Sequence, residues 1–241
     1  MAAICASTAL TLYYFNYSPD LLPYPLRGVD VSHHQGQIDW PKVAKSDIAF
    51  AILKATEGGD LVDDSFASNL AGARAAGLAV GVYHFFTFCR SGADQAKNFL
   101  AVVPRDGRML PPAIDLEFGG NCAARPAVAD LKRELADFLT PVEAAFGRPA
   151  IFYVMDDTAA LYADALPDRA RWVRSIAWQP ASSNWVYWQY HNAGRVEGIN
   201  GDVDLNVLQG GRHRLSRLLQ QQSSGPRRGD RAGFQIFEAA G

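Results

Sequence analysis

The sequence predicts a single α/β domain folded as an irregular, TIM-like (β/α) barrel with few helices in its second half. Over residues 27–217, short apolar runs alternate with amphipathic segments, and eight of these runs have the length of a strand. The runs 48–55 (IAFAILKA) and 78–86 (LAVGVYHFF) are apolar throughout, as in parallel strands that are buried on both faces. No repeat occurs at a fixed period, so we expect one barrel rather than a repeat array.

Four strands, each followed by a helix, are expected in the first half of the barrel. Asp39, with Pro41 near the first turn, is a typical helix start, and Gly77 and Gly147 are typical helix ends. Asp63 or Asp64 is the expected cap of the second helix. We expect strands over 28–32, 48–55, 78–86 and 110–118, one helix beginning near residue 39, and helices over 63–76, 92–103 and 127–146.

The second half is expected to consist mainly of strands. Its apolar runs predict strands over 149–155, 171–176, 185–190 and 203–207, and only a short helix near 158–163. Functional side chains of such barrels collect at the carboxyl ends of the strands. The candidate site residues are therefore sought there.

Both ends of the chain differ from the barrel in composition. Residues 2–15 are apolar or weakly polar, and no basic residue precedes Arg27, so we expect an export signal or membrane anchor that starts further upstream. A core or surface-lying segment is the alternative. Residues 18–25 contain three prolines and predict an extended linker. The expected organisation is therefore a segment and linker over 1–26, a barrel over 27–217, and a polar, disordered tail over 218–241.

Composition and motifs exclude several other classes of protein. With 23 basic and 25 acidic side chains and a net charge of −2, the chain lacks the basic excess of a nucleic-acid-binding protein. It contains no G-x-S-x-G, Walker or G-x-G-x-x-G motif. His33 and His34, placed on a strand, would face opposite sides, and the calcium-loop-like stretch 202–213 has Val207 and His213 at the positions that need Gly and Glu. We expect no metal and no cofactor.

Two carboxylates, Asp115 and Glu117, end the strand expected over 110–118. Residues two apart on a strand face the same side, with backbone origins roughly 6.6 Å apart. Alone, this pair fits an exposed strand end as well as an acid/base pair. Asp30 and Asp204 lie at the ends of the first and last expected strands, so four acids should meet at one end of the barrel.

The motifs that carry these acids resemble, in order, those of the glycoside hydrolase family 25 lysozymes. The resemblance covers about residues 27–208 and implies an irregular (β/α) barrel. It further implies cleavage of the β-1,4 bond between N-acetylmuramic acid and N-acetylglucosamine in peptidoglycan. The matching stretches are 28–33 (GVDVSH), 38–40 (IDW), 54–58 (KATEG), 81–85 (GVYHF), 112–117 (PAIDLE), 188–190 (WQY) and 203–206 (VDLN).

The resemblance implies a role for each matching acid. Glu117 is similar to the general acid, and Asp115 to its partner, a nucleophile or a group that orients the substrate's acetamido group. Asp30 and Asp204 match the other two acids of the site. The residues expected to contact the sugar are Tyr83, His33, Tyr153, Trp188 and Gln189, although Tyr153 fits the core equally well. The sequence departs from the family at His34 and over 174–178, which affects the sugar subsites.

Glycosidic cleavage needs a carboxylic acid that protonates the leaving oxygen and a carboxylate that stabilises the oxocarbenium-like positive charge on the sugar. Neighbouring acids should keep Glu117 protonated, because nearby negative charge raises a carboxyl pKa. The expected spacing between Asp115 and Glu117 lies between the carboxyl–carboxyl distances typical of retaining and of inverting glycosidases. A substrate-assisted route, with Asp115 orienting the acetamido group, fits it; retention and inversion both stay open.

Structural roles are expected for several other polar residues. Lys54 and Glu57 are expected to pair with each other, and His84 to be a buried, hydrogen-bonded histidine of the barrel. Cys89 and Cys122 follow neighbouring strands at the same end of the barrel, so a disulfide is expected, with two free thiols as the alternative.

These expectations amount to an exported, monomeric peptidoglycan hydrolase located in the periplasm, in the cell envelope or outside the cell. Its partners would be peptidoglycan glycan strands, with no nucleic acid, and the N-terminal segment could hold it at a membrane. Two alternatives stay open: a catalytically inactive glycan-binding barrel, and a chitinase-like glycosidase with the same acid pair.

Overall fold

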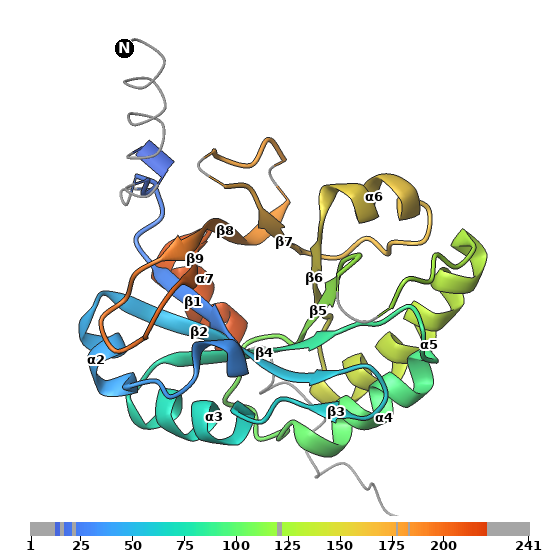
Figure 1. The fold of residues 1–241 in the computed structure, drawn as a ribbon, viewed down its shortest axis with the longest axis horizontal. Helices are drawn as coiled ribbons and strands as arrows, with labels where there is room; N and C mark the ends of the chain where they lie inside the picture. Colours follow the sequence, from blue (N-terminus) through green and yellow to red (C-terminus); the bar gives the residue numbers. More distant parts are fainter. Residues whose placement is uncertain are drawn as a thin grey trace, which may run out of the picture.

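A closed barrel of eight strands forms the centre of the chain in the computed structural model, which describes residues 13–14, 17–20, 23–119, 122–176, 178–182 and 184–220 (Figure 1). Pairing of β1 with β2 closes the sheet, and β3 is a short extra strand on the edge of β2. The strands are β1 (Arg27–Val31), β2 (Ile48–Glu57), β3 (Leu61–Val62), β4 (Ala79–Phe85), β5 (Ala113–Leu116), β6 (Ile151–Val154), β7 (Arg171–Arg174), β8 (Trp185–Gly194) and β9 (Val203–Leu208).

The predicted irregular α/β barrel is confirmed, with one strand reversed relative to an all-parallel barrel. Strand β9 runs antiparallel to both of its neighbours, β8 and β1, whereas the other neighbouring barrel strands are parallel. The reversal has a simple cause. A parallel crossover needs about a dozen residues or more, and the short connection 195–202 can only return the chain antiparallel.

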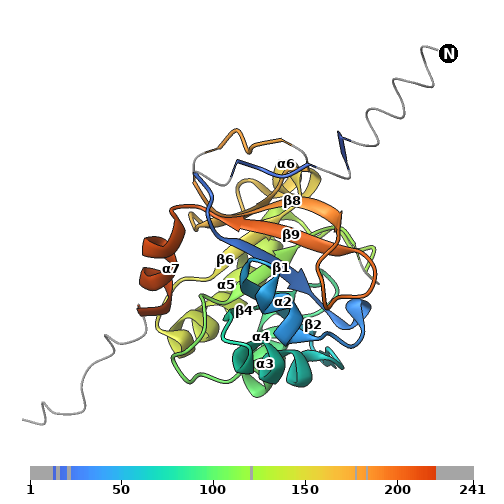
Figure 2. The ribbon, with the colours of Figure 1, turned by 90° about the vertical axis from the view of Figure 1, so that its left-hand side faces the viewer.

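Helices cover the outside of the first half of the barrel and become sparse in the second, as predicted (Figures 1 and 2). In the described part of the chain, no helix lies between β7 and β8 or between β8 and β9. The helical segments are η1 (His33–Gln35), α2 (Trp40–Lys45), α3 (Phe66–Ala75), α4 (Gly92–Val102), α5 (Val128–Phe146), α6 (Asp156–Tyr162) and α7 (Gly211–Gln220).

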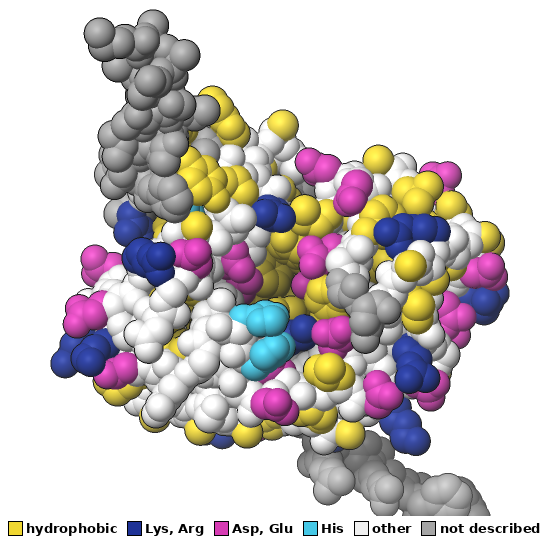
Figure 3. All heavy atoms as spheres, in the orientation of Figure 1, with side chains coloured by type: hydrophobic (Ala, Val, Ile, Leu, Met, Phe, Trp, Pro, Cys, Tyr) yellow, Lys and Arg dark blue, Asp and Glu magenta, His cyan; other side chains and the backbone are white. Residues whose placement is uncertain are grey.

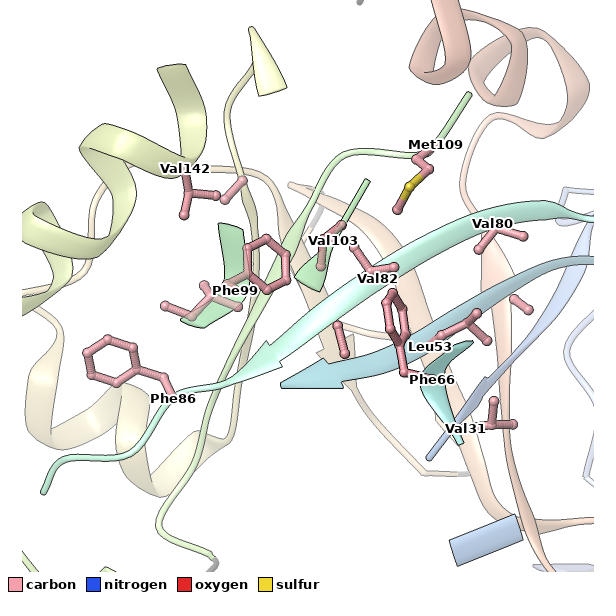
Figure 4. Close-up of a cluster of buried hydrophobic side chains, with 14 of the residues drawn as sticks. Val31, Leu53, Phe66, Val80, Val82, Phe86, Phe99, Val103, Met109 and Val142 are labelled. Carbon is pink, nitrogen blue, oxygen red and sulfur yellow. The ribbon is translucent and has the colours of Figure 1, made fainter. Parts of the chain in front are cut away.

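Alternation along the strands divides the core into two layers. On β2, Ala51 and Leu53 pack outward in the layer between sheet and helices, and Phe50 and Ile52 fill the barrel interior. Figure 4 shows the outer layer, in which Leu53 lies near side chains from other strands and helices. Because both layers are apolar, β2 reads as a continuous hydrophobic run in the sequence.

Two local predictions need correction. Helix α3 starts at Phe66 rather than at residue 63. Asp63 lies ahead of it and accepts a hydrogen bond from the Ser65 N–H through Oδ1 at 3.0 Å, and hydrogen bonds from the backbone and ring of His33 through Oδ2. Helix α7, which we did not predict, reaches Gln220 and so includes the first residues of the expected tail. Its leucines at 215, 218 and 219 share one helical face and pack against the interior layer. Apart from residues 13 and 14, the expected signal or anchor over 2–15 lies outside the described residues, and so does the rest of the expected tail, 221–241.

Cys89 and Cys122 form a disulfide, at the positions where we expected one. It joins the segment before α4 to the segment before α5, across a sequence separation of 33. Closing a loop of this length stabilises the folded state by roughly 4 kcal/mol in the chain-entropy account.

Replacing both cysteines by serine should therefore lower the melting temperature by about 10 °C. Thermal denaturation of the oxidised parent and of the double variant measures this difference. The reduced parent is the matched control and should melt with the variant. Equal melting temperatures for all three samples would contradict the prediction.

Candidate active site

A cavity of about 390 Å³ opens at the carboxyl ends of the parallel barrel strands and at the amino end of the reversed strand β9. Figure 3 shows the hollow, with acidic and histidine side chains around it. A larger hollow of about 650 Å³ lies at the opposite ends of β1, β2 and β4 and has Asp47 as its one lining acid. The lining residues of the smaller cavity are Asp30, Ser32, His34, Lys54, Tyr83, Phe85, Asp115, Glu117, Tyr153, Trp172, Arg174, Gln189, Asn192 and Asp204.

Asp30 and Asp204 face each other across the antiparallel pair β1–β9. Asp30 accepts hydrogen bonds from Asn206 Nδ2 at 2.6 Å and Gln189 Nε2 at 3.1 Å. Burial raises the pKa of Asp30 to about 6 against the effect of these donors. Burial and the neighbouring Asp30 raise the pKa of Asp204 to about 9, so this pair holds a proton at neutral pH.

The raised pKa values of Asp30 and Asp204 predict that the stability of the fold depends on pH. A carboxyl whose folded pKa is raised stabilises the fold below its unfolded pKa of about 4, and that contribution is lost as the pH rises through the folded value. Stability should thus fall between about pH 4 and 9, and Asp204→Asn should flatten the decline.

Melting temperatures measured from pH 4 to 9 test this expectation. Asp202→Asn is the matched control, because Asp202 is exposed and pairs with Arg195 at 2.9 Å outside the cavity. Parallel curves for the parent and Asp204→Asn would rule out the shared proton.

Asp115 and Glu117 enter the same cavity from the end of β5. Asp115 is buried, and its Oδ1 has no hydrogen-bond partner among the described residues. Burial, followed by the charges of Glu117 and Asp30, raises its pKa well above the usual range. Burial also raises the pKa of Glu117, and Arg174 opposes that shift. The cavity therefore keeps Glu117 protonated to a higher pH than an exposed glutamate.

Two cations border the acids, and only one of them has an ion-pair partner among the described residues. Lys54 Nζ lies 2.7 Å from Glu57 Oε2, the pairing we expected, and 4.8 Å from the centre of the Phe85 ring. Among the described residues, no carboxylate lies within 4.0 Å of the Arg174 guanidinium. Arg174 is thus a cation in the cavity without an ion-pair partner there.

Aromatic side chains form the wall of the cavity. The ring centres of Tyr153 and Trp172 lie 4.9 Å apart, and those of Tyr83 and Trp172 lie 6.0 Å apart. The Tyr153 hydroxyl donates to Gln189 Oε1 at 3.2 Å, so Gln189 links this wall to Asp30. Tyr83, Tyr153 and Gln189 therefore lie where we expected contacts with the sugar.

Trp188 does not line the cavity, contrary to expectation. It is 1% exposed and packs with Trp185, Tyr190 and Tyr24 on the outer side of β8, while its indole nitrogen donates to the Ser175 carbonyl at 2.8 Å. Neighbouring strand residues face opposite sides, so Gln189 points inward and Trp188 outward.

The adjacent histidines also differ from expectation. They lie on η1 rather than on a strand, with ring centres 4.0 Å apart. His33 Nδ1 lies 2.9 Å from Asp63 Oδ2, and His33 does not line the cavity, whereas His34 does. His84 is buried, as expected, between Thr56 and Gln95, and burial lowers its pKa to about 3.

Sequence reasoning did not assign a site role to Trp172, His34 or Asn192 and treated Arg174 only as a departure from a pattern. A signal was available for two of them: Trp172 and Arg174 are two apart on a predicted strand and therefore share its inward face. Within the described ranges, no cluster of three or more potential ligands could hold a metal ion, and no helix is long and apolar enough to cross a membrane.

Comparisons with known proteins each cover most of the chain. The profile of the glycosyl hydrolases family 25 matches residues 29–199. Protein YegX of Escherichia coli K12 is 34% identical over 200 residues, 78% of this chain and 71% of YegX. Lysozyme M1 of Streptomyces globisporus is 34% identical over 209 residues, 80% of this chain and 71% of that protein. The structure of a family 25 glycosyl hydrolase from Bacillus anthracis superposes with a TM-score of 0.76 at 37% identity, covering 83% of this chain and 95% of that one.

Proposed function

The chain belongs to glycosyl hydrolase family 25, and from this premise we propose that its acidic cavity cleaves the muramic acid–glucosamine bond of peptidoglycan, with Glu117 as general acid and Asp115 as its partner. The chain is a glycoside hydrolase and a lysozyme. One observation carries the residue assignment: four carboxyl groups from three strands converge on one cavity, with Asp115 Oδ1 unpartnered.

The two carboxyl groups of β5 suit different steps of the reaction. Glu117, with its raised pKa, can give a proton to the leaving glycosidic oxygen. The free Oδ1 of Asp115 can accept the acetamido N–H of the sugar and orient its carbonyl towards the anomeric carbon. The ionised form of Asp115 would stabilise the positive charge that develops on the sugar as Glu117 transfers its proton to the leaving oxygen.

Asp30 and Asp204 support this pair from β1 and β9, which do not adjoin β5 in the barrel. Their negative charge raises the pKa of Asp115, and the donors Asn206 and Gln189 fix the Asp30 carboxylate in place. Tyr83, Tyr153 and Trp172 supply the flat apolar surface on which sugar rings pack.

Digestion of purified peptidoglycan, followed by mass spectrometry of the products, tests the proposal. We expect fragments with muramic acid at the new reducing end, and little release from chitin oligomers measured in parallel. Products ending in glucosamine would overturn the bond assignment. Binding to peptidoglycan without cleavage would favour the inactive glycan-binding alternative, and preferential chitin cleavage the chitinase-like one.

A second part of the proposal concerns location. A substrate in the cell wall calls for a protein outside the cytoplasm, and we propose that residues 2–15 act as a signal or membrane anchor ahead of the linker and the barrel domain. A monomer is sufficient, because every acid of the cavity comes from one chain. Cell fractionation of the full chain and of a chain lacking residues 2–15 tests the location; equal distribution of the two would contradict it.

A further inference from the structure

Arg174 is a charged residue of the cavity that has no role in the proposed reaction. It ends β7, next to Gln189 of β8, and its half-buried side chain lines the same cavity as Glu117 and Asp204. The hydrogen bond recorded for its guanidinium goes to the thioether of Met155, with Nη1 3.7 Å from Sδ. A thioether is a weak acceptor, so most of the five guanidinium donors are left for a ligand.

The other cation of the cavity differs in this respect. Lys54 is neutralised by Glu57 at 2.7 Å, and both side chains are largely buried. The remaining lining charges are the four carboxyl groups, which repel an anionic ligand. A substrate with a negative group near this wall of the cavity would therefore need Arg174.

We propose that Arg174 is a specificity-determining residue that binds a carboxylate of the glycan substrate. The inference rests on the proposed function and names the chemical class of group that the site selects. An arginine fork matches a carboxylate in a two-point, charge-assisted contact, which a neutral chitin chain cannot offer. Peptidoglycan carries such groups either on the lactyl ether of muramic acid or on the attached peptide.

Binding measurements on an inactivated background test the inference separately from catalysis. Glu117→Gln and Glu117→Gln/Arg174→Ala proteins would be titrated calorimetrically with three probes. These are a glucosamine–muramic acid tetrasaccharide with free lactyl carboxylates, the same tetrasaccharide as lactyl methylamides, and a disaccharide–peptide with free peptide carboxylates.

We expect loss of Arg174 to weaken binding of one carboxylate probe by roughly tenfold or more and binding of the methylamide by less than about twofold. The probe that responds identifies the source of the carboxylate. Arg174→Lys should bind with intermediate affinity, since it keeps the charge and loses the fork. Arg195→Ala removes an equal charge from an exposed position outside the cavity and should change no affinity.

Equal weakening for all three probes, or no weakening for either carboxylate probe, would overturn the inference. In the active protein, Arg174→Ala should raise KM on peptidoglycan more than it lowers kcat. A shifted pH profile without any difference between probes would instead assign Arg174 to the protonation of Glu117 and also overturn the inference. Failure of the parent to cleave peptidoglycan would count against the proposed function, whereas the binding series would still decide the role of Arg174.

Discussion

Replacing Glu117 by glutamine is expected to reduce peptidoglycan hydrolysis by about 10²- to 10⁴-fold, the contribution typical of a general acid. Glutamine keeps the size of the side chain and its place in the cavity, but it has no proton to give to the leaving oxygen. Burial of Glu117 raises its pKa, so the parent carries this proton over a wider pH range than an exposed glutamate would. The loss should therefore appear in kcat and leave KM nearly unchanged.

A cell-wall zymogram and the initial rate of release of reducing ends both measure this loss. Glu197→Gln is the matched control, because it makes the same chemical change at an exposed position outside the cavity. We expect the control to keep the rate of the parent. A Glu117→Gln protein as active as the parent would remove Glu117 from the role of general acid.

Much of the fold can be predicted from periodicity alone, because buried parallel strands leave a strong signal. The runs at β2 and β4 are apolar on both faces, since one face meets the helices and the other fills the barrel. Helix α7 could not be predicted in the same way. Its sequence is polar, and its few leucines become informative only when the interior layer that they cover is known.

Three acids of the site could be predicted from topology, because Asp30 and Asp115 lie near the carboxyl ends of parallel strands and Glu117 follows one of them. Asp204 lies near the amino end of β9 and reaches the same edge because β9 runs antiparallel; an all-parallel barrel would have put it at the opposite edge. The inward or outward direction of a residue at such an end is less predictable. Trp188 was expected at the sugar because it matches an aromatic position of the family, but it is buried on the outer side of β8, and its neighbour Gln189 takes the inward side.

The same burial that prepares the acids for catalysis should weaken the fold. Asp115 has an oxygen without a hydrogen bond, and burial and neighbouring charges raise its pKa. A buried, unsatisfied polar atom typically costs about 1–3 kcal/mol. The cavity thus holds groups that suit a bound sugar better than they suit the empty protein, a common conflict between activity and stability.

Asp115→Asn separates these two effects within one variant. The amide cannot carry the negative charge that stabilises the oxocarbenium-like transition state, so we expect kcat to fall by about 10²-fold or more. Melting temperature should rise at pH 7, because the substitution removes a carboxyl that is costly to ionise in the folded state. The sign follows from the raised pKa: such a group penalises the fold as the pH rises and not below its unfolded value of about 4. The gain in stability should therefore vanish in acid.

Rates on peptidoglycan and melting temperatures at pH 3.5 and 7, chosen to lie on either side of roughly pH 4, test both parts together. Asp137→Asn, on the exposed face of α5, is the matched control and should change neither. Lost activity with unchanged stability at pH 7 would mean that ionisation of Asp115 carries no cost in the folded protein. Higher stability with full activity would mean that Asp115 is buried for a reason other than the reaction, and the partner of Glu117 would then have to be sought in Asp30 or Asp204, the remaining acids of the cavity.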